Sequence, residues 1–169
     1  MLHIVPYSAP YQQRVATMIL HIQQEEFNVP VTIEDQPDLL HIDTAYQQRC
    51  GNFWIALDDD NVVGTIGLID IGNNQGCLRK MFVKEGYRGK EKGTGQLLLD
   101  TLVQWCRENN IDEIYLGTIN RMAAALKFYA RNGFTHIDKN NLPPAFPLML
   151  VDNIFLQLDL KNSATHDNY

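Results

Sequence analysis

Apolar residues recur along the chain at two spacings, and each spacing predicts a type of element. Residues 10–27 carry apolar positions three or four apart, which predicts an amphipathic helix. The positions with this spacing are Val15, Met18, Ile19 and Ile22. A second helix is predicted within residues 33–49, beginning at Pro37 or Asp38. Two helices are therefore expected before the first strand.

The middle of the chain changes to shorter, strand-like apolar runs. Residues 52–72 predict a β-hairpin around the polar turn DDDN, and residues 77–83 predict a third strand. A glycine-rich basic segment follows this strand. Apolar residues from Leu97 to Cys106 then return to helical spacing, which predicts a helix that ends at the polar run ENN.

The remaining third of the chain alternates strand and helix. Residues 112–118 predict a short strand, and residues 122–134 predict a helix whose Asn132 and Gly133 form its C-terminal stop. Late strands are predicted at THIDK and NIFLQLDL, separated by the proline-rich run NLPPAFPLMLVD. This order favours a mixed sheet with helices on both faces. We expect one domain over residues 1–162 and a polar tail at 163–169.

Composition narrows the class of protein. With 45% hydrophobic and 20% charged residues, the chain is typical of a globular domain. Its start, MLHIVPYSAPYQQR, lacks the features of a secretory signal, so we expect a cytoplasmic protein without a membrane segment. Three widely spaced cysteines suggest neither a disulfide framework nor a zinc site. No bound metal is expected.

The distribution of charge says more than its total. The net charge of −6 argues against nonspecific nucleic-acid binding, which needs a basic surface. Residues 79–92 nevertheless hold six Lys and Arg residues and only two Glu residues. A solvated lysine-rich loop is the simplest interpretation of such a cluster. The glycines within this segment instead favour a binding site for an anionic ligand.

The segment GYRGKEKGTGQLLLDTLVQW, residues 86–105, places a glycine-rich loop at the start of the predicted helix. Such a loop exposes backbone N–H groups at the positive end of the helix dipole, which is suited to a phosphate. The loop lacks the Gly-Lys-Ser or Gly-Lys-Thr end of a Walker motif. It also lacks the GxGxxG spacing of a dinucleotide fingerprint.

The loop resembles the acetyl-CoA loop of the GNAT superfamily of N-acetyltransferases. That family carries Gln or Arg, two residues, Gly, one residue, then Gly or Ala, behind Tyr-Arg-Gly. Here Tyr87, Arg88 and Gly89 precede the segment, and Lys90 replaces the usual first residue. The other residues of the loop motif are Glu91, Lys92, Gly93, Thr94 and Gly95. The segments MFV, IYLGT and LKFYARNGF fall where the family has its other conserved parts, and the combined match covers about residues 53–137.

The resemblance implies a fold and a cofactor. It implies a single GNAT-like α/β domain whose mostly antiparallel sheet is splayed at the cofactor site, with acetyl-CoA as co-substrate. The backbone of Met81, Phe82 and Val83 would pair with the pantetheine arm, and the amides of residues 88–95 would hold the pyrophosphate. Asn120 would contact the cofactor, although the family's usual asparagine position holds Met122 here.

The resemblance also implies catalytic roles. Tyr129 matches the tyrosine that protonates the departing CoA thiolate, and a structural core aromatic is the alternative. Glu26 is the candidate general base, although a solvated surface glutamate is the commoner role for such a residue. Since an amine of pKa ~10.4 attacks only after it loses a proton, a base or a water relay is needed.

The expected reaction is direct acetyl transfer to a primary amine in a ternary complex. A small molecule, a peptide or a protein could supply the amine, and the acidic body of the chain favours a cationic acceptor. Two alternatives stay open at this point: a noncatalytic CoA-binding sensor and a protein with an atypical nucleotide loop. A homodimer is a further possibility.

Overall fold

A computed structural model describes residues 1–120 and 122–163 of the chain. Residues 164–169, most of the predicted tail, lie outside the described residues. Within the described part, no helix combines the length and the apolar character needed to cross a bilayer.

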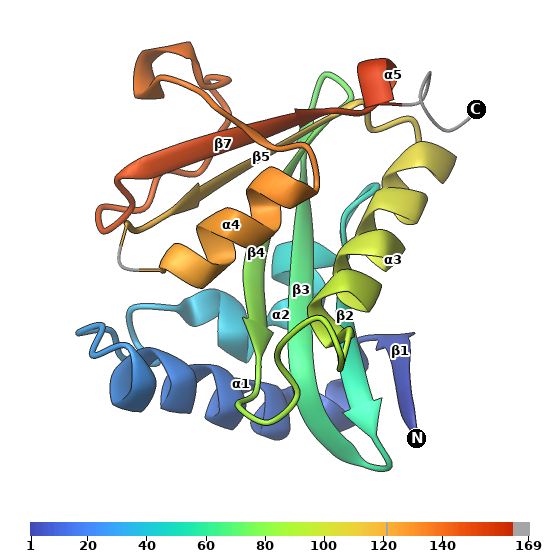
Figure 1. Ribbon diagram of the computed structural model, residues 1–169, viewed down its shortest axis with the longest axis vertical. Helices are drawn as coiled ribbons and strands as arrows, with labels where there is room; N and C mark the ends of the chain where they lie inside the picture. Colours follow the sequence, from blue (N-terminus) through green and yellow to red (C-terminus); the bar gives the residue numbers. More distant parts are fainter. Residues whose placement is uncertain (121, 164–169) are drawn as a thin grey trace.

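One seven-stranded sheet organises the described residues, in the order β1-β2-β3-β4-β5-β7-β6 (Figure 1). The strands are β1 (Leu2–Pro6), β2 (Asn52–Asp58), β3 (Asn61–Gly72), β4 (Gln75–Val83), β5 (Glu113–Thr118), β6 (Thr135–His136) and β7 (Ile154–Asp159). All neighbours are antiparallel except β4 and β5, which are parallel. The predicted mixed, mostly antiparallel sheet is confirmed.

Helices cover both faces of this sheet. The α-helices are α1 (Gln12–His21), α2 (Ile42–Tyr46), α3 (Thr94–Glu108), α4 (Ala123–Arg131) and α5 (Leu160–Ser163). A π-helical turn, η2 (Ile22–Glu26), continues α1, and 3-10 turns occur at η1 (Ala9–Tyr11), η3 (Pro37–Leu40) and η4 (Lys139–Asn141). In Figure 1, α3 and α4 lie in front of the strands.

Hydrophobic cores lie on both faces of the sheet, as the alternation of β2 shows. Phe53 and Ile55 enter the core beneath α1 and α2, whereas Trp54 and Ala56 enter the core beneath α3 and α4. Successive side chains of a strand point to opposite faces, so a run of six buried residues supplies both cores. The sheet is therefore a central layer between two helical layers.

Two predicted elements differ from the structure, and one strand was not predicted. The N-terminal strand β1 was not predicted. It is a five-residue edge strand with no regular burial alternation, and it is extended because it pairs with β2. The predicted second helix is split into η3 and α2, because His41 has non-helical backbone angles. The strand predicted at THIDK shortens to β6.

Candidate active site

A gap opens between the parallel strands β4 and β5. They pair only over residues 75–77 and 113–115, and Figure 1 shows β5 and β7 running obliquely away from β4. A bulge marks the parting: the pairing of β3 with β4 shifts register after Thr65, and Lys80 takes a left-handed φ of 53°. The Thr65 hydroxyl donates to the Lys80 carbonyl at 2.7 Å, which holds the bulge in place.

Beyond this bulge, β4 pairs with β3 on one side, and no described strand pairs with its other edge. The Lys84 N–H donates to the Val63 carbonyl at 2.8 Å, so alternate residues direct their backbone groups to β3. Phe82, which pairs with Thr65, shares that direction. Met81 and Val83 direct theirs toward the gap, which is the orientation that pantetheine pairing requires.

The glycine loop leads from this edge to the start of α3. Gly86, Gly89 and Gly93 all have positive φ, at 93°, 99° and 70°. The first hydrogen bond at the helix start runs from the Leu97 N–H to the Gly93 carbonyl at 3.0 Å. The N–H groups of residues 94–96 therefore have no partner within the helix, and they form a potential anion site.

Not every predicted loop group is free for a ligand. The Gly93 N–H donates to the Gly89 carbonyl at 3.0 Å, so it is used inside the loop. The Thr94 side chain is fully buried, and its hydroxyl has no partner among the described residues. Lys90 and Lys92 are exposed. The exposed residue between them, Glu91, adds one negative charge to the loop.

Arg88 folds back across the end of β4 instead of projecting from the loop. Its guanidinium is 2.7 Å from the Glu26 carboxylate, and its Nε donates to the Val83 carbonyl at 2.7 Å. It also lies over the Phe27 ring, 5.9 Å from the ring centroid. The structure thus brings two predicted residues, Glu26 and Arg88, into one ion pair that joins η2 to the loop.

Tyr129 lies on the α3 and α4 side of the sheet. The ring is buried and packs edge-on against Phe128 and Phe134, with centroid distances of 5.7 and 5.3 Å. Burial raises the pKa of the Tyr129 hydroxyl above its usual value, so the phenol stays protonated at neutral pH. A protonated phenol is the form that an acid catalyst requires.

Asn120 lies between β5 and α4. Its backbone N–H donates to the Asn153 side-chain oxygen at 3.0 Å, and the residue is exposed. The contact ties the loop after β5 to the segment before β7. The hydrogen bond uses the Asn120 backbone and not its side chain.

A polar cluster on the opposite face of the sheet was missed by the sequence analysis. The Lys80 ammonium donates to the Gln36 side-chain oxygen at 2.6 Å and lies 3.6 Å from the Asp38 carboxylate. The Tyr46 hydroxyl donates to the same carboxylate at 2.6 Å, and Gln23 and Gln36 exchange amide hydrogen bonds of 2.9 Å. The available signal was the adjacent pair Arg79 and Lys80 in a strand that is otherwise apolar.

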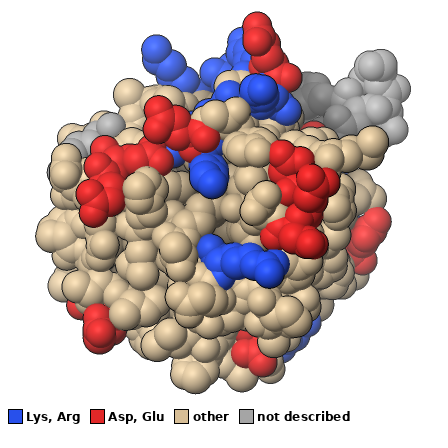
Figure 2. Space-filling model, turned by 90° about the horizontal axis from the view of Figure 1, so that it is seen from below, with Lys and Arg blue, Asp and Glu red and all other residues tan. Residues whose placement is uncertain are grey.

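Burial shifts the pKa of Lys80 in this cluster and that of the nearby Asp152. The Lys80 side chain is only 6% exposed, and desolvation lowers its pKa while the nearby Asp38 opposes the shift. Burial likewise raises the pKa of Asp152, against the attraction of Arg79 and Lys80. Figure 2, a view from below Figure 1, shows a face hollowed near its centre, with Lys and Arg side chains bordering the hollow.

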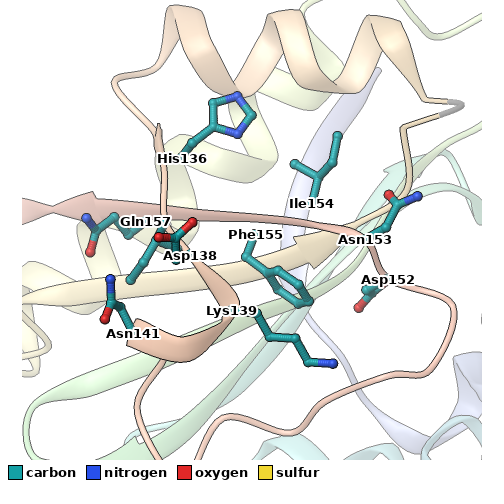
Figure 3. Close-up of a pocket in the computed structure, with 10 residues that line it drawn as sticks. His136, Asp138, Lys139, Asn141, Asp152, Asn153, Ile154, Phe155 and Gln157 are labelled. Atoms are coloured by element: carbon teal, nitrogen blue, oxygen red, sulfur yellow. The ribbon is translucent and has the colours of Figure 1, made fainter.

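A groove of about 760 Å³ lies along β7 on the far side of the gap (Figure 3). Asp152 and Asn153 lie at one end of it, and Asn141 and Gln157 lie at the other. It contains none of the glycine-loop residues. We therefore do not assign it to the cofactor.

Comparison with known proteins agrees with this geometry. Residues 16–134 match the sequence model described as the acetyltransferase (GNAT) family. The chain belongs to the acetyltransferase (GNAT) family.

Solved structures support the same assignment over almost the whole chain. An acetyltransferase of the GNAT family from Staphylococcus aureus Mu50 is 43% identical, with a TM-score of 0.91, covering 95% of this chain and 99% of that one. An acetyltransferase from Streptococcus agalactiae 2603 is 28% identical, with a TM-score of 0.89, covering 94% and 98%.

Curated relatives match a smaller share of their own length. The N-acetylaspartate synthetase of Rattus norvegicus is 30% identical over 125 residues, which is 72% of this chain and 41% of that protein. The chain spans less than half the length of the first curated relatives it matches.

Proposed function

We propose that this protein is an acetyl-CoA-dependent N-acetyltransferase that transfers the acetyl group directly to a primary amine. The observation that carries the proposal is the gap between β4 and β5, with a glycine loop and the start of α3 at one end of it. Membership of the GNAT family supports CoA as the acetyl carrier.

The positions of the polar groups favour a ternary complex. Tyr129 belongs to the core on the α3 and α4 side of the sheet, whereas the cluster around Lys80 and Asp38 lies on the α1 and α2 side. A donor held by α3 and an acceptor held by the opposite face would meet in the gap. No covalent enzyme intermediate is needed in such an arrangement.

In the proposed reaction, the free amine attacks the thioester carbonyl carbon and forms a C–N bond. The backbone N–H of Val83 faces the gap and would stabilise the oxyanion. Collapse breaks the C–S bond, and Tyr129 donates its proton to the departing thiolate. Desolvation raises the pKa of the thiol as well as that of the phenol, which keeps this proton transfer feasible.

The base that removes the amine proton is proposed to be Glu26. Its side chain is mostly buried, with 18% exposed. Its ion pair with Arg88, which binds the Val83 carbonyl, holds the carboxylate near the end of β4. The same ion pair competes for the carboxylate. Replacing the two residues separately distinguishes these roles.

Free-thiol release from acetyl-CoA tests the proposal, with simple amines, amino acids and lysine peptides as acceptors. We expect at least one acceptor to release thiol, and Tyr129→Phe to lower kcat by ~10²–10⁴-fold while acetyl-CoA binding is retained. Tyr7→Phe, which removes a hydroxyl from the other core, is the matched control. Acetyl-CoA binding without thiol release, and with no effect of Tyr129→Phe, would instead favour a CoA-binding sensor.

A further inference from the structure

Two opposite charges on the α1 and α2 face make no salt bridge with any residue that the structure describes. Arg79 is half-buried, and its guanidinium donates a hydrogen bond to the Met149 sulfur at 3.4 Å, with no described carboxylate at salt-bridge distance. The Asp152 carboxylate is half-buried and makes no hydrogen bond or ion pair with the described residues. Lys80, in contrast, is already paired with Asp38.

Both charges lie where β4 and β5 part. Cys77 and Tyr115 form the last pair of the parallel ladder, so Arg79 on β4 and Gly117 on β5 are the next residues on the same face. Asp152 lies against Gly117, since a Cβ atom there would be 2.6 Å from its Oδ2. One cation and one anion thus flank the mouth of the gap.

This face is the one from which an acceptor would enter. Asp38 and Tyr46, of the α1 and α2 side, are near enough to Arg79 to influence its pKa, and so is Asp152. Tyr129 lies on the other face. The charges are therefore separated from the proposed leaving-group acid by the sheet itself.

Half-buried charges that make no salt bridge lose hydration, and attraction from more distant groups replaces only part of it. Such a pair is stabilised by a ligand that offers both complementary charges. A simple cationic amine would satisfy Asp152 and leave Arg79 unpaired and repelling it. A molecule with an ammonium and a carboxylate a few atoms apart satisfies both.

We propose that the acceptor is an amino acid, with Arg79 binding its carboxylate and Asp152 its ammonium group at the mouth of the gap. Arginine suits this role because its planar guanidinium can bind a carboxylate through two parallel hydrogen bonds. The inference rests on the proposed acetyl transfer and identifies the class of its acceptor.

The test compares each L-amino acid with its own carboxamide, in the thiol-release assay with the full chain and saturating acetyl-CoA. The two compounds share the amine and the side chain and differ in the negative charge. Since hydrogen bonds to charged groups are the stronger ones, we expect at least one amino acid to exceed its amide by about tenfold or more in kcat/KM. Arg79→Gln should remove this preference, and Arg79→Lys should restore part of it.

Controls separate folding from recognition. Arg49→Gln removes an exposed arginine that binds the Asp70 carbonyl on β3 and that lies outside the proposed site, so it should leave the preference intact. Asp152→Asn should raise KM for the amino acid, whereas Asp60→Asn in the exposed β2–β3 turn should not. Every variant that is compared should unfold in one cooperative transition above the assay temperature and bind acetyl-CoA as tightly as the unsubstituted protein.

The outcomes are distinguishable. Amides or simple amines that react as well as the amino acids would overturn the acceptor assignment and leave the transferase function standing. A preference that persists in Arg79→Gln would remove Arg79 from the site. Acetyl-CoA binding with no thiol release for any class of acceptor would overturn the transferase function itself.

Discussion

At the scale of single residues, the proposed base Glu26 is also the ion-pair partner of Arg88. Its carboxylate is 2.7 Å from the Arg88 guanidinium, and Arg88 also binds the Val83 carbonyl at the edge of the gap. The residue can therefore act on the amine proton or hold Arg88 in place. Each duty has a different kinetic signature.

We expect Glu26→Gln to lower kcat by ~10²-fold or more with little change in KM, because a general base acts on the amine in the reaction step and not on substrate binding. Steady-state kinetics with a fixed acceptor provide the measurement. Arg88→Gln is the matched control, since it breaks the same ion pair and spares the carboxylate. Equal losses in the two variants would show that Glu26 acts by positioning Arg88.

Asp152 is expected to destabilise the folded protein when it is ionised. Burial raises its folded pKa above the unfolded value of ~3.9, so the folded state binds the proton more tightly. The stability that this group contributes is present below the unfolded pKa and is lost as pH rises through the folded pKa.

Asp152→Asn should therefore raise the melting temperature at pH 8, and the gain should shrink toward pH 4. Thermal melts of the two proteins across this range provide the measurement. The exposed Asp60→Asn variant should show no such trend. A constant difference at all pH values would mean that the substitution acts through packing.

At the scale of elements, the junction between the glycine loop and α3 depends on one left-handed residue. Gly93 precedes α3 with φ of 70° and ψ of 9°, and its carbonyl accepts the first hydrogen bond at the helix start. A Cβ atom at this position would meet only the Lys90 carbonyl oxygen, at 4.0 Å, so there is space for a side chain. The left-handed backbone angles, and not space, favour glycine at this position.

Gly93→Ala should cost about 1–2 kcal/mol of unfolding free energy, because residues with a Cβ are disfavoured in this region. Gly93→Asn should cost less, because asparagine tolerates it. Denaturant unfolding measures both variants, and acetyl-CoA titration should show the weaker binding in Gly93→Ala. Equal costs would indicate that the loop readily adopts another conformation.

At the scale of the whole molecule, the splayed sheet lies between two helical layers. The buried residues of the two layers belong to separate hydrophobic clusters. A ligand that fills the gap would contact β4 and α3 together, so binding should stabilise the whole fold. Binding to the folded state alone adds ~2.7 kcal/mol at a hundredfold excess over Kd.

Acetyl-CoA at that excess should raise the melting temperature by roughly 5–10 °C, given ~2–4 °C per kcal/mol for a domain of this size. Free CoA should also stabilise, and Mg²⁺-ATP should not, since the loop lacks the Walker lysine and serine pair. Thermal melting with the three ligands in parallel provides the measurement. An equal response to Mg²⁺-ATP would indicate a general phosphate site.

Much of the architecture could be predicted from local pattern. The hairpin of β2 and β3, the strand β4, the long helix α3 and the strand β5 all have a period or a turn residue that acts over a few positions. Edge strand β1 has neither, because its five residues become a strand only when β2 offers hydrogen-bond partners. The break at His41 likewise depends on its backbone angles in the folded chain.

The sequence by itself determined the fold class, the position of the glycine loop and the family, because these depend on short-range spacing and on backbone freedom at glycine. The tertiary structure decided which charged groups meet. Glu26 pairs with Arg88 across 62 positions of the chain, and Asp152 approaches Gly117 beside β4. Coulomb attraction depends on distance in space and desolvation depends on burial, and both quantities are defined only in the folded structure.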